Sequence, residues 1–414
     1  MPTAKTPHHI FIARQPIFKR NMRVFAYELL FRSGLANFFD PRQDGEEASS
    51  KVITNSFLLI GIAKVTGGKK AFINFTEDMV LSGYPTLFPN RDAVIEILED
   101  VRVTEEVVAA CRELVAQGYV LALDDFLYDD HFIPLLKIAK IVKFDIRQMS
   151  FAELKRQVKI VKQYKVKLLA EKIETFEEFE AVKELGFDLF QGYFFSKPKI
   201  VEGRDIPGSK LHYLQVLRLI GDENFDFSKL GELIARDVSL AYKLLKYVNS
   251  AYFARMHEVE SLTSAVAMLG ELNLRKWLAL MMLSYLADDK PSELLRLATL
   301  RGSFCELIAV RLLRRGRDAA LFHTAGMFSL LPAMLDKPMA DIIGELALAP
   351  LVKEALLGRG VNPIFQALCL VKAYERGEWE PVLTLVNALG VKLDDLPPLY
   401  EAALETLLLF DFTD

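Results

Sequence analysis

The chain of 414 residues is longer than one ordinary hydrophobic core, so we start from the hypothesis of two folding units. With 26% charged residues and a formal net charge of −4, it gives no electrostatic reason to expect a nucleic-acid partner. The three cysteines are far apart and fit neither a disulfide framework nor a zinc site, and the longest apolar run is too short to cross a bilayer, so we expect a cytoplasmic protein without membrane insertion.

The first half alternates short apolar runs with helix signals. Residues 10–15 and 24–30 predict two strands joined by a short polar turn, which should pair antiparallel, and a helix is expected near residues 46–62. Six further runs predict strands at 71–75, 93–98, 120–123, 141–144, 167–170 and 187–190. This alternation predicts a mainly parallel sheet closed into an eight-stranded barrel, with an open doubly wound sheet as the alternative.

Helix ends between these strands are marked by their own residues. Thr104 precedes two glutamates, and capping boxes are predicted at Ser150 with Glu153 and at Thr175 with Glu178. Gly186 is a helix-ending glycine.

Polar side chains recur where the predicted strands end. In a parallel barrel these ends converge on one face, so residues distant in sequence meet over one cavity. Any single member has an ordinary explanation as a cap or ion-pair partner, but recurrence at six strand ends favours a site. The set comprises Glu28, Asn74, Glu96 with Glu99, Asp124 with Asp125, Lys143 with Asp145, Glu171 with Glu174, and Gln191.

This set indicates a particular chemistry. Carboxylates and an amide carbonyl are hard oxygen ligands suited to magnesium or manganese, and Lys143 beside them can orient a nucleophilic water. The combination predicts metal-assisted hydrolysis of a phosphodiester.

The order of motifs along residues 10–198 resembles an EAL domain. Such domains are cyclic-di-GMP phosphodiesterases with a modified TIM-like (β/α)8 barrel, whose first strand is antiparallel, and they use two divalent cations to linearise the dinucleotide. The motifs are Gln15-Pro16-Ile17, Tyr27-Glu28-Leu29-Leu30-Phe31-Arg32, Ile73-Asn74-Phe75, Glu96-Ile97-Leu98-Glu99, Asp124-Asp125-Phe126, Lys143-Phe144-Asp145, Ala170-Glu171-Lys172-Ile173-Glu174 and Gln191-Gly192-Tyr193.

The resemblance implies roles for individual residues. Lys143 matches the residue that places the attacking water, Glu99 an acid that supports a loop, and Arg32 a contact to a ligand phosphate. Glu174 joins the catalytic candidates, and Gln191 the ligand-binding ones. The positions that match metal ligands are Glu28, Asn74, Glu96, Asp124, Asp125 and Glu171.

The chain departs from the EAL pattern in two motifs and in the span from Lys143 to Glu171, which is shorter than in active relatives. The signature Glu-Ala-Leu is Glu28-Leu29-Leu30 here, and the Gly-Thr-Gly expected after the paired aspartates is replaced by Leu127-Tyr128-Asp129-Asp130. Glycines allow unusual backbone angles that Leu and Tyr restrict. The inner ligand set therefore looks kept, while its supporting loop is altered.

The second half carries apolar residues at helical spacing. We place the barrel at residues 1–202, a linker at 203–209 and an all-α domain at 210–414. Residues 236–252 and 264–270 resemble the opening of an HDOD domain, a helical relative of HD metal phosphohydrolases that is associated with signalling. Asn249 and Ser250 are interpreted as a helix end, and Met281 and Met282 as core filling.

Hydrolysis of the HD type requires an adjacent His-Asp pair at a metal, and the sequence has none. Its nearest remnant is His323-Thr324, where Thr supplies no anionic oxygen, so His323 is interpreted as structural and no cofactor is expected in this domain.

Three functions remain for an EAL–HDOD protein of the cyclic-di-GMP network. The altered loop favours a degenerate barrel that acts as a sensor or scaffold, with the HDOD domain presenting the output surface to an unknown protein partner. The alternatives are an active metal-dependent cyclic-di-GMP phosphodiesterase and a protein-interaction module that needs no nucleotide.

Overall fold

The computed structural model describes residues 10–33, 62–199, 208–222, 227–235, 237–250, 259 and 261–410. The chain divides into two compact units, one of residues 1–195 with 373–380 and one of 196–372 with 381–414. The predicted linker 203–209 falls mostly outside the described residues, so the domain boundaries stay a prediction.

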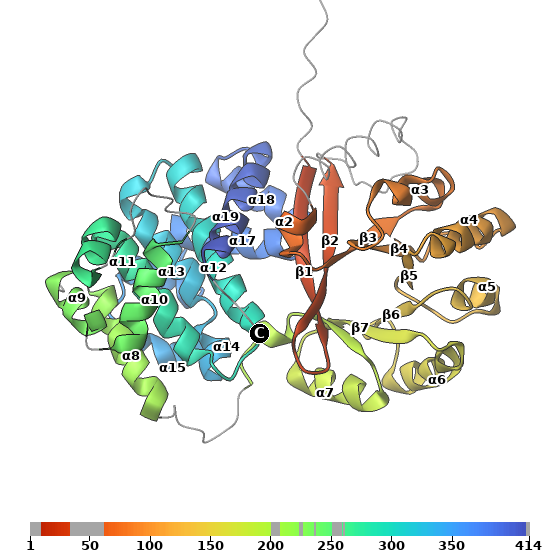
Figure 1. Cartoon of the computed structure of the whole chain (residues 1–414), viewed down its shortest axis with the longest axis horizontal. Coiled ribbons are helices and arrows are strands. Elements are labelled where there is room, and N and C mark those ends of the chain that lie inside the picture. Colours follow the sequence, from red (N-terminus) through yellow and green to blue (C-terminus); the bar gives the residue numbers. More distant parts are fainter. Residues whose placement is uncertain are drawn as a thin grey trace, which may run out of the picture. The chain divides into compact units, whose positions relative to one another are not determined.

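The first unit is built on a closed eight-stranded barrel in which the strands follow one another in sequence order. The first strand pairs antiparallel with both the second and the last, and every other neighbouring pair is parallel. The predicted modified barrel is thereby confirmed, and the open sheet is excluded. The strands are β1 (Ile10–Lys19), β2 (Val24–Ser33), β3 (Lys70–Phe75), β4 (Ala93–Ile97), β5 (Val120–Leu123), β6 (Ile141–Asp145), β7 (Lys167–Ile173) and β8 (Leu189–Gly192) (Figure 1).

The barrel interior is filled by an apolar layer to which each strand contributes one buried residue. The small Ala26 and Ala122 offset larger neighbours such as Phe72, and this lets eight side chains fill the ring without a pore. This floor supports the polar residues at the strand ends. The layer consists of Ile17, Ala26, Phe72, Val94, Ala122, Ile141, Leu169 and Leu189.

Helices follow the strands at the positions that the caps predict. Thr104 accepts a hydrogen bond from the Val107 amide, and Thr175 forms a complete capping box with Glu178. At Ser150 only the hydroxyl half forms, because the Glu153 carboxylate accepts hydrogen bonds from Arg156 and Gln157 instead. The helices are α2 (Ile62–Thr66), α3 (Glu77–Leu81), α4 (Glu105–Ala116), α5 (Ile133–Leu136), α6 (Phe151–Val161) and α7 (Phe176–Leu185). Apart from its last residue, the helix expected at 46–62 lies outside the described residues.

The second unit is helical throughout its described part, as predicted. No described helix combines the length and the apolar character that crossing a membrane requires. Its helices are α8 (Gly208–Gly221), α9 (Phe227–Ala235), α10 (Val238–Val248), α11 (Leu262–Leu286), α12 (Ser292–Leu307), α13 (Ala319–Phe328), α14 (Leu331–Leu335), α15 (Met339–Ile342), α16 (Pro350–Leu356), α17 (Pro363–Glu375), α18 (Trp379–Leu389) and α19 (Leu396–Thr406).

Asn249 ends α10, which confirms its predicted role. Its amide donates to the Leu245 carbonyl, and its side chain both donates to and accepts from the backbone of Val259. The Asn249 side chain thereby satisfies both backbone polar groups of Val259.

A candidate metal centre at the barrel mouth

The predicted polar residues converge on one end of the barrel because neighbouring strands place them side by side. Asn74 of β3 is the register partner of Glu96 of β4, and Glu28 of β2 is the partner of Gln15 of β1. Glu171 of β7 lies inside the strand rather than after it, since β7 extends to Ile173. The closed ring therefore brings residues from most of its strands to one mouth, as the sequence predicted.

Lys143 is the centre of this mouth. Its side chain is fully buried, and it is surrounded by four carboxylates from four different strands or strand ends. A buried ammonium requires this compensation, since an unpaired charge in the interior is strongly unfavourable. The Nζ atom lies 2.6 Å from Glu96 Oε1, 2.7 Å from Asp124 Oδ1, 2.7 Å from Glu171 Oε1 and 3.6 Å from Glu28 Oε1.

The paired aspartates are fixed by the backbone on both sides. The Asp124 amide donates to the Ile97 carbonyl, and the Phe126 amide donates to the Lys143 carbonyl, each over 2.9 Å. Between these anchors, Asp125 has φ of 38°, a left-handed conformation that is uncommon for a residue with a side chain. The two anchors thus hold a turn that aims both carboxylates at the mouth.

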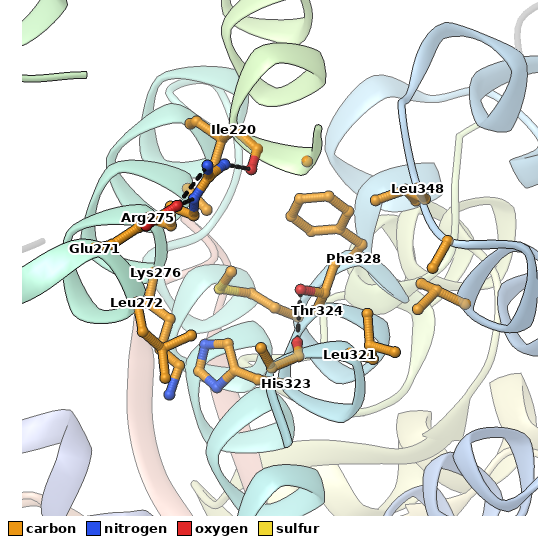
Figure 2. A pocket seen from close by; sticks show the side chains of 16 residues that line it. Ile220, Glu271, Leu272, Arg275, Lys276, Leu321, His323, Thr324, Phe328 and Leu348 are labelled. Carbon is orange, nitrogen blue, oxygen red and sulfur yellow. Dashed lines mark hydrogen bonds and ion pairs between the residues drawn. The ribbon is translucent and has the colours of Figure 1, made fainter. Parts of the chain in front are cut away.

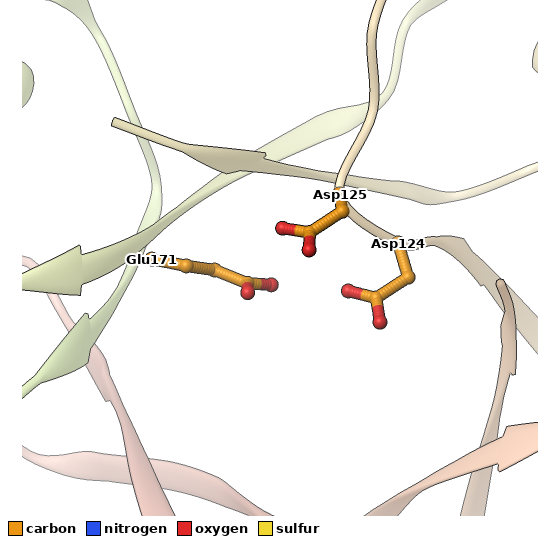
Figure 3. A group of neighbouring side chains, drawn as sticks. All are labelled: Asp124, Asp125 and Glu171. Atoms are coloured by element: carbon orange, nitrogen blue, oxygen red, sulfur yellow. The ribbon is translucent and has the colours of Figure 1, made fainter. Parts of the chain in front are cut away.

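Asp124, Asp125 and Glu171 form a compact acidic group. Each contributes one carboxylate oxygen, and these three atoms lie within 4.8 Å of one another (Figure 3). Figure 3 shows the three side chains pointing toward a common space from β7 and from the end of β5. Such a separation suits carboxylates that share one or two divalent cations.

Amide side chains orient Glu28. Gln191 donates from Nε2 to Glu28 Oε2 and, over 3.0 Å, to Gln15 Oε1. Asn74 donates from Nδ2 to Glu28 Oε1 over 3.5 Å, and the Oδ1 atom of Asn74 takes no part in this contact. The amides therefore hold the Glu28 carboxylate in one orientation.

Four carboxylates face a single ammonium, and this imbalance shifts the pKa values of the group. Burial raises the pKa of Glu96 well above its usual value against the lowering effect of Lys143, and the charges of Glu28, Asp124 and Glu171 raise it further. Burial likewise raises the pKa of Glu171. Burial alone would lower the pKa of Lys143, but the surrounding carboxylates raise it well above its usual value, so the lysine stays charged.

Several oxygen atoms at the barrel mouth have no hydrogen-bond partner among the described residues, and this suits the binding of a divalent cation. Within the part of the chain that the structure describes, buried Asn74 Oδ1 and Asp125 Oδ1 accept no hydrogen bond, and neither oxygen of Glu96 has one with good geometry. Buried oxygens are rarely left without a partner in a folded protein. Hard oxygen atoms around a surplus of negative charge are the surroundings that magnesium or manganese requires.

Other predicted residues lie at the edge of the mouth or apart from it. Glu99 is exposed, and its pKa is raised by partial burial and then by the charges of Asp124 and Asp125, so it lies within their electrostatic reach. Glu174 lies apart from the Lys143 cluster, where it pairs with Arg147 at 3.3 Å. Arg32 belongs to β2, but its side chain is outside the described part.

The altered loop Leu127–Asp130, which follows the paired aspartates, is hydrogen-bonded to helix α6 of the same unit. The Tyr128 amide donates to Oε1 of the buried Gln157 over 2.9 Å, and the Tyr128 hydroxyl donates to Asp130 Oδ1 over 2.8 Å. His131 Nδ1 lies 2.7 Å from Asp129 Oδ1. The side chains that replace the expected glycines therefore form their own set of local contacts.

Sequence reasoning did not assign a role to three residues that support the site. Gln15 contacts Gln191, Gln157 anchors the loop, and the ammonium of Lys172 reaches Asp145 Oδ2 at 2.5 Å and Asp125 Oδ2 at 3.7 Å. In the observed hairpin register, Gln15 lies opposite Glu28. Gln157 lies three residues after Leu154 and four before Val161, on the buried face of α6, so the helical spacing of these apolar residues was the signal that could have indicated it.

Comparison with protein families gives two matches. The EAL domain matches residues 80–198 and the HDOD domain residues 206–337. The first match begins after β3, so Glu28 and Asn74 lie outside the matched span.

Two curated proteins are similar along nearly the whole chain. The uncharacterized protein YuxH of Bacillus subtilis is 36% identical over 406 residues, covering 96% of this chain and 97% of its own. The cyclic di-GMP phosphodiesterase CdgJ of Vibrio cholerae is 34% identical over 398 residues, covering 95% of this chain and 91% of its own. The chain belongs to the family of two-domain proteins in which an EAL domain is followed by an HDOD domain.

Among solved structures, an EAL domain protein from Listeria monocytogenes EGD-e is 20% identical, with a TM-score of 0.36 over 45% of this chain and 87% of that one. A likeness at that level carries no further argument.

Proposed function

We propose that the barrel is a metal-dependent phosphodiesterase that hydrolyses cyclic-di-GMP to the linear dinucleotide. The observation that carries the proposal is the convergence of Glu28, Glu96, Asp124 and Glu171 on Lys143 at one barrel mouth. A relative that is similar over 95% of the chain is named a cyclic di-GMP phosphodiesterase, which supports this activity over a silent regulator.

The reaction requires one water molecule for each phosphodiester bond. The water oxygen bonds to phosphorus, the bond from phosphorus to the 3′ oxygen breaks, and that oxygen takes up a proton to become a hydroxyl. Divalent cations bound by the carboxylates would polarise the phosphate and increase the acidity of the attacking water.

The residues of the chain supply the positioning. Lys143 holds Glu96, Asp124 and Glu171 within reach of one another, and its ammonium is a donor to the attacking water in the proposed role. Gln191 and Asn74 hold Glu28, so the oxygen set is oriented before substrate binds. Arg32 is proposed to contact a phosphate of the dinucleotide.

The second candidate is a sensor that binds cyclic-di-GMP without turnover. It is favoured by one observation, the loop Leu127–Asp130, whose tyrosine is bonded to Gln157 where glycines were expected. A fixed loop that differs from the expected one can leave the ligand set in place and lower the rate. The protein partner of the helical domain stays a prediction in either case.

The test is turnover by the full-length protein. Purified protein with Mn²⁺ is incubated with cyclic-di-GMP, and the products are separated by ion-exchange chromatography. Linear dinucleotide is expected from the unmodified protein and from Glu180→Gln, an exposed acid paired with Lys183. None is expected from Glu171→Gln, which changes one oxygen of the cluster.

Calorimetry separates the two candidates. Saturable binding of cyclic-di-GMP without any linear product would support the sensor and overturn the phosphodiesterase. Absence of both binding and product would overturn both and leave the nucleotide-independent module.

A further inference from the structure

The helical unit contains a cavity, partly open to solvent, that the barrel chemistry does not use. Its volume is about 380 Å³, within the range of small-molecule sites in proteins. It lies among α8, α11, α13 and α16, which contribute residues from 220 to 352, and all sixteen side chains that line it belong to this unit (Figure 2).

Most of the wall is apolar. It includes Ile220, Leu272, Leu321, Met327, Phe328 and Val352. The surface of such a cavity favours an apolar occupant, since water there gains few hydrogen bonds.

One end of the wall is fixed by an ion pair. Arg275 binds Glu271 Oε1 at 2.8 Å and donates to the carbonyls of Ile220 and Asp222 at 2.6 and 3.1 Å. Figure 2 shows this pair on one side of the cavity and His323 away from it. These contacts use Arg275 to tie α11 to the end of α8, so we assign it a structural role rather than a ligand contact.

Two further basic side chains line the cavity and share one carboxylate partner. Lys276 and His323 both line the cavity, and both contact the same carboxylate, Glu306, which does not line it. His323 Nδ1 lies 3.0 Å from Glu306 Oε2, and the Lys276 ammonium contacts Glu306 Oε1. Two basic side chains thus belong to the wall of the cavity, while the carboxylate that they share lies outside it. Thr324 also lines the cavity. Its hydroxyl donates a hydrogen bond to the Ala320 carbonyl over 2.8 Å, so its oxygen can still accept one.

We propose that this cavity is a binding site for a small molecule with an apolar, ring-sized body and one anionic group, which the Lys276 ammonium and the His323 ring receive. The apolar wall selects the body, and the two donors select the anion. His323, interpreted from the sequence as a structural residue, would then contact the ligand. The site is independent of the barrel, so its failure would leave the proposed phosphodiesterase untouched.

Two fluorescent probes with the same aromatic framework test the proposal on the full-length protein. Anilinonaphthalene sulfonate carries one sulfonate, and phenylnaphthylamine is the same molecule without it. The sulfonate probe is expected to bind at one saturable site per chain and more tightly than its uncharged analogue.

Two variants locate the probe. Lys276→Gln is expected to weaken the sulfonate probe about tenfold, the value of one charge-assisted hydrogen bond, and to leave the uncharged probe unchanged. Ala320→Phe fills the cavity from α13 and is expected to weaken both probes. Lys243→Gln is the matched control, because Lys243 contacts the Tyr285 hydroxyl at 3.2 Å in the same unit without lining the cavity.

Circular dichroism establishes whether each variant is folded. If either Lys276→Gln or Ala320→Phe does not fold, the other variant still tests the proposal. The proposal is overturned by the absence of a saturable site in the unmodified protein. It is equally overturned when folded Ala320→Phe binds both probes normally, or when folded Lys276→Gln binds the sulfonate probe as tightly as Lys243→Gln does.

Discussion

Lys143 Nζ lies 2.6 Å from Glu96 Oε1, and both side chains are completely buried in the barrel. A lysine and a glutamate without any solvent contact stabilise a fold only as partners, since each alone would be an uncompensated buried charge. Because three more acids share the same ammonium, Lys143 is the internal counter-ion of the mouth as well as a candidate catalytic group.

Replacement of this lysine should therefore affect stability as well as turnover. Lys143→Met is expected to lower the free energy of unfolding in EDTA by about 3–5 kcal/mol, since it leaves the carboxylates facing one another. Urea unfolding measures the change. Lys183→Met is the control, because its ammonium pairs with the exposed Glu180 and should contribute under about 1 kcal/mol. Equal losses for both variants would contradict the counter-ion role.

Divalent cations should stabilise the barrel through the paired aspartates. Mn²⁺ at about a hundred times its Kd is expected to add roughly 2.7 kcal/mol to the stability of the unmodified protein. Asp125→Asn should lose most of this gain, and Asp129→Asn, an exposed loop acid, should keep it. Thermal unfolding with and without Mn²⁺ measures the difference, and an unchanged gain in Asp125→Asn would remove Asp125 from the ligand set.

The loop anchor should matter for both stability and rate. Gln157→Ala leaves the Tyr128 amide without its acceptor and is expected to cost about 1–3 kcal/mol. Turnover should fall because the loop follows directly after the aspartates. Urea unfolding and product formation are measured together. The control is Gln117→Ala, an exposed glutamine whose side-chain amide donates to the Glu113 carboxylate. A normal rate in Gln157→Ala would show that this loop does not support the site.

The helical unit should lose stability in acid through Glu306. Burial would raise the pKa of this carboxyl, but His323 and Lys276 outweigh it and lower the pKa to about 2 from a usual 4.5. A lowered pKa in the folded state means that the contribution is complete above 4.5 and is lost as the pH falls toward 2. The melting temperature of the unmodified protein should exceed that of Glu306→Gln most near about pH 7, and the gap should narrow below about pH 4.

Glu345→Gln is the control for this pH series, since Glu345 is exposed in the same unit. A gap for Glu306→Gln that stays constant from neutral to acid pH would contradict the contribution assigned to its charge.

Much of the barrel was predictable because periodicity reports burial directly. Alternating strands and helices indicated eight strands, and the short turn before Val24 indicated the antiparallel hairpin. The convergence of strand-end acids followed from the topology of a parallel barrel alone. Strand ends were less accurate, since β7 continues through Glu171 to Ile173 where the apolar run had already stopped.

Side-chain partners were less predictable. Glu171 and Glu174 differ by three residues in sequence, yet one contacts Lys143 and the other Arg147, a difference set by which side of the chain each faces. In the helical unit, Lys276 and Glu306 have the pattern of ordinary solvated charges, and only the packing of α11 against α12 brings the two side chains into contact, with Lys276 on the cavity wall.

The antiparallel strand β1 lies between β2 and β8, where it pairs Ile17 with Gln191 and Lys19 with Leu189. During synthesis, β1 therefore cannot complete its pairing until β8 has been made, and the ring can close only then. Until residue 192 has emerged, one edge of β1 has no partner, and Gln191 is not yet present to orient Glu28. Assembly of the acidic mouth is thus tied to the final step of barrel synthesis, so a shortened nascent barrel would hold the acids without the arrangement that makes them a site.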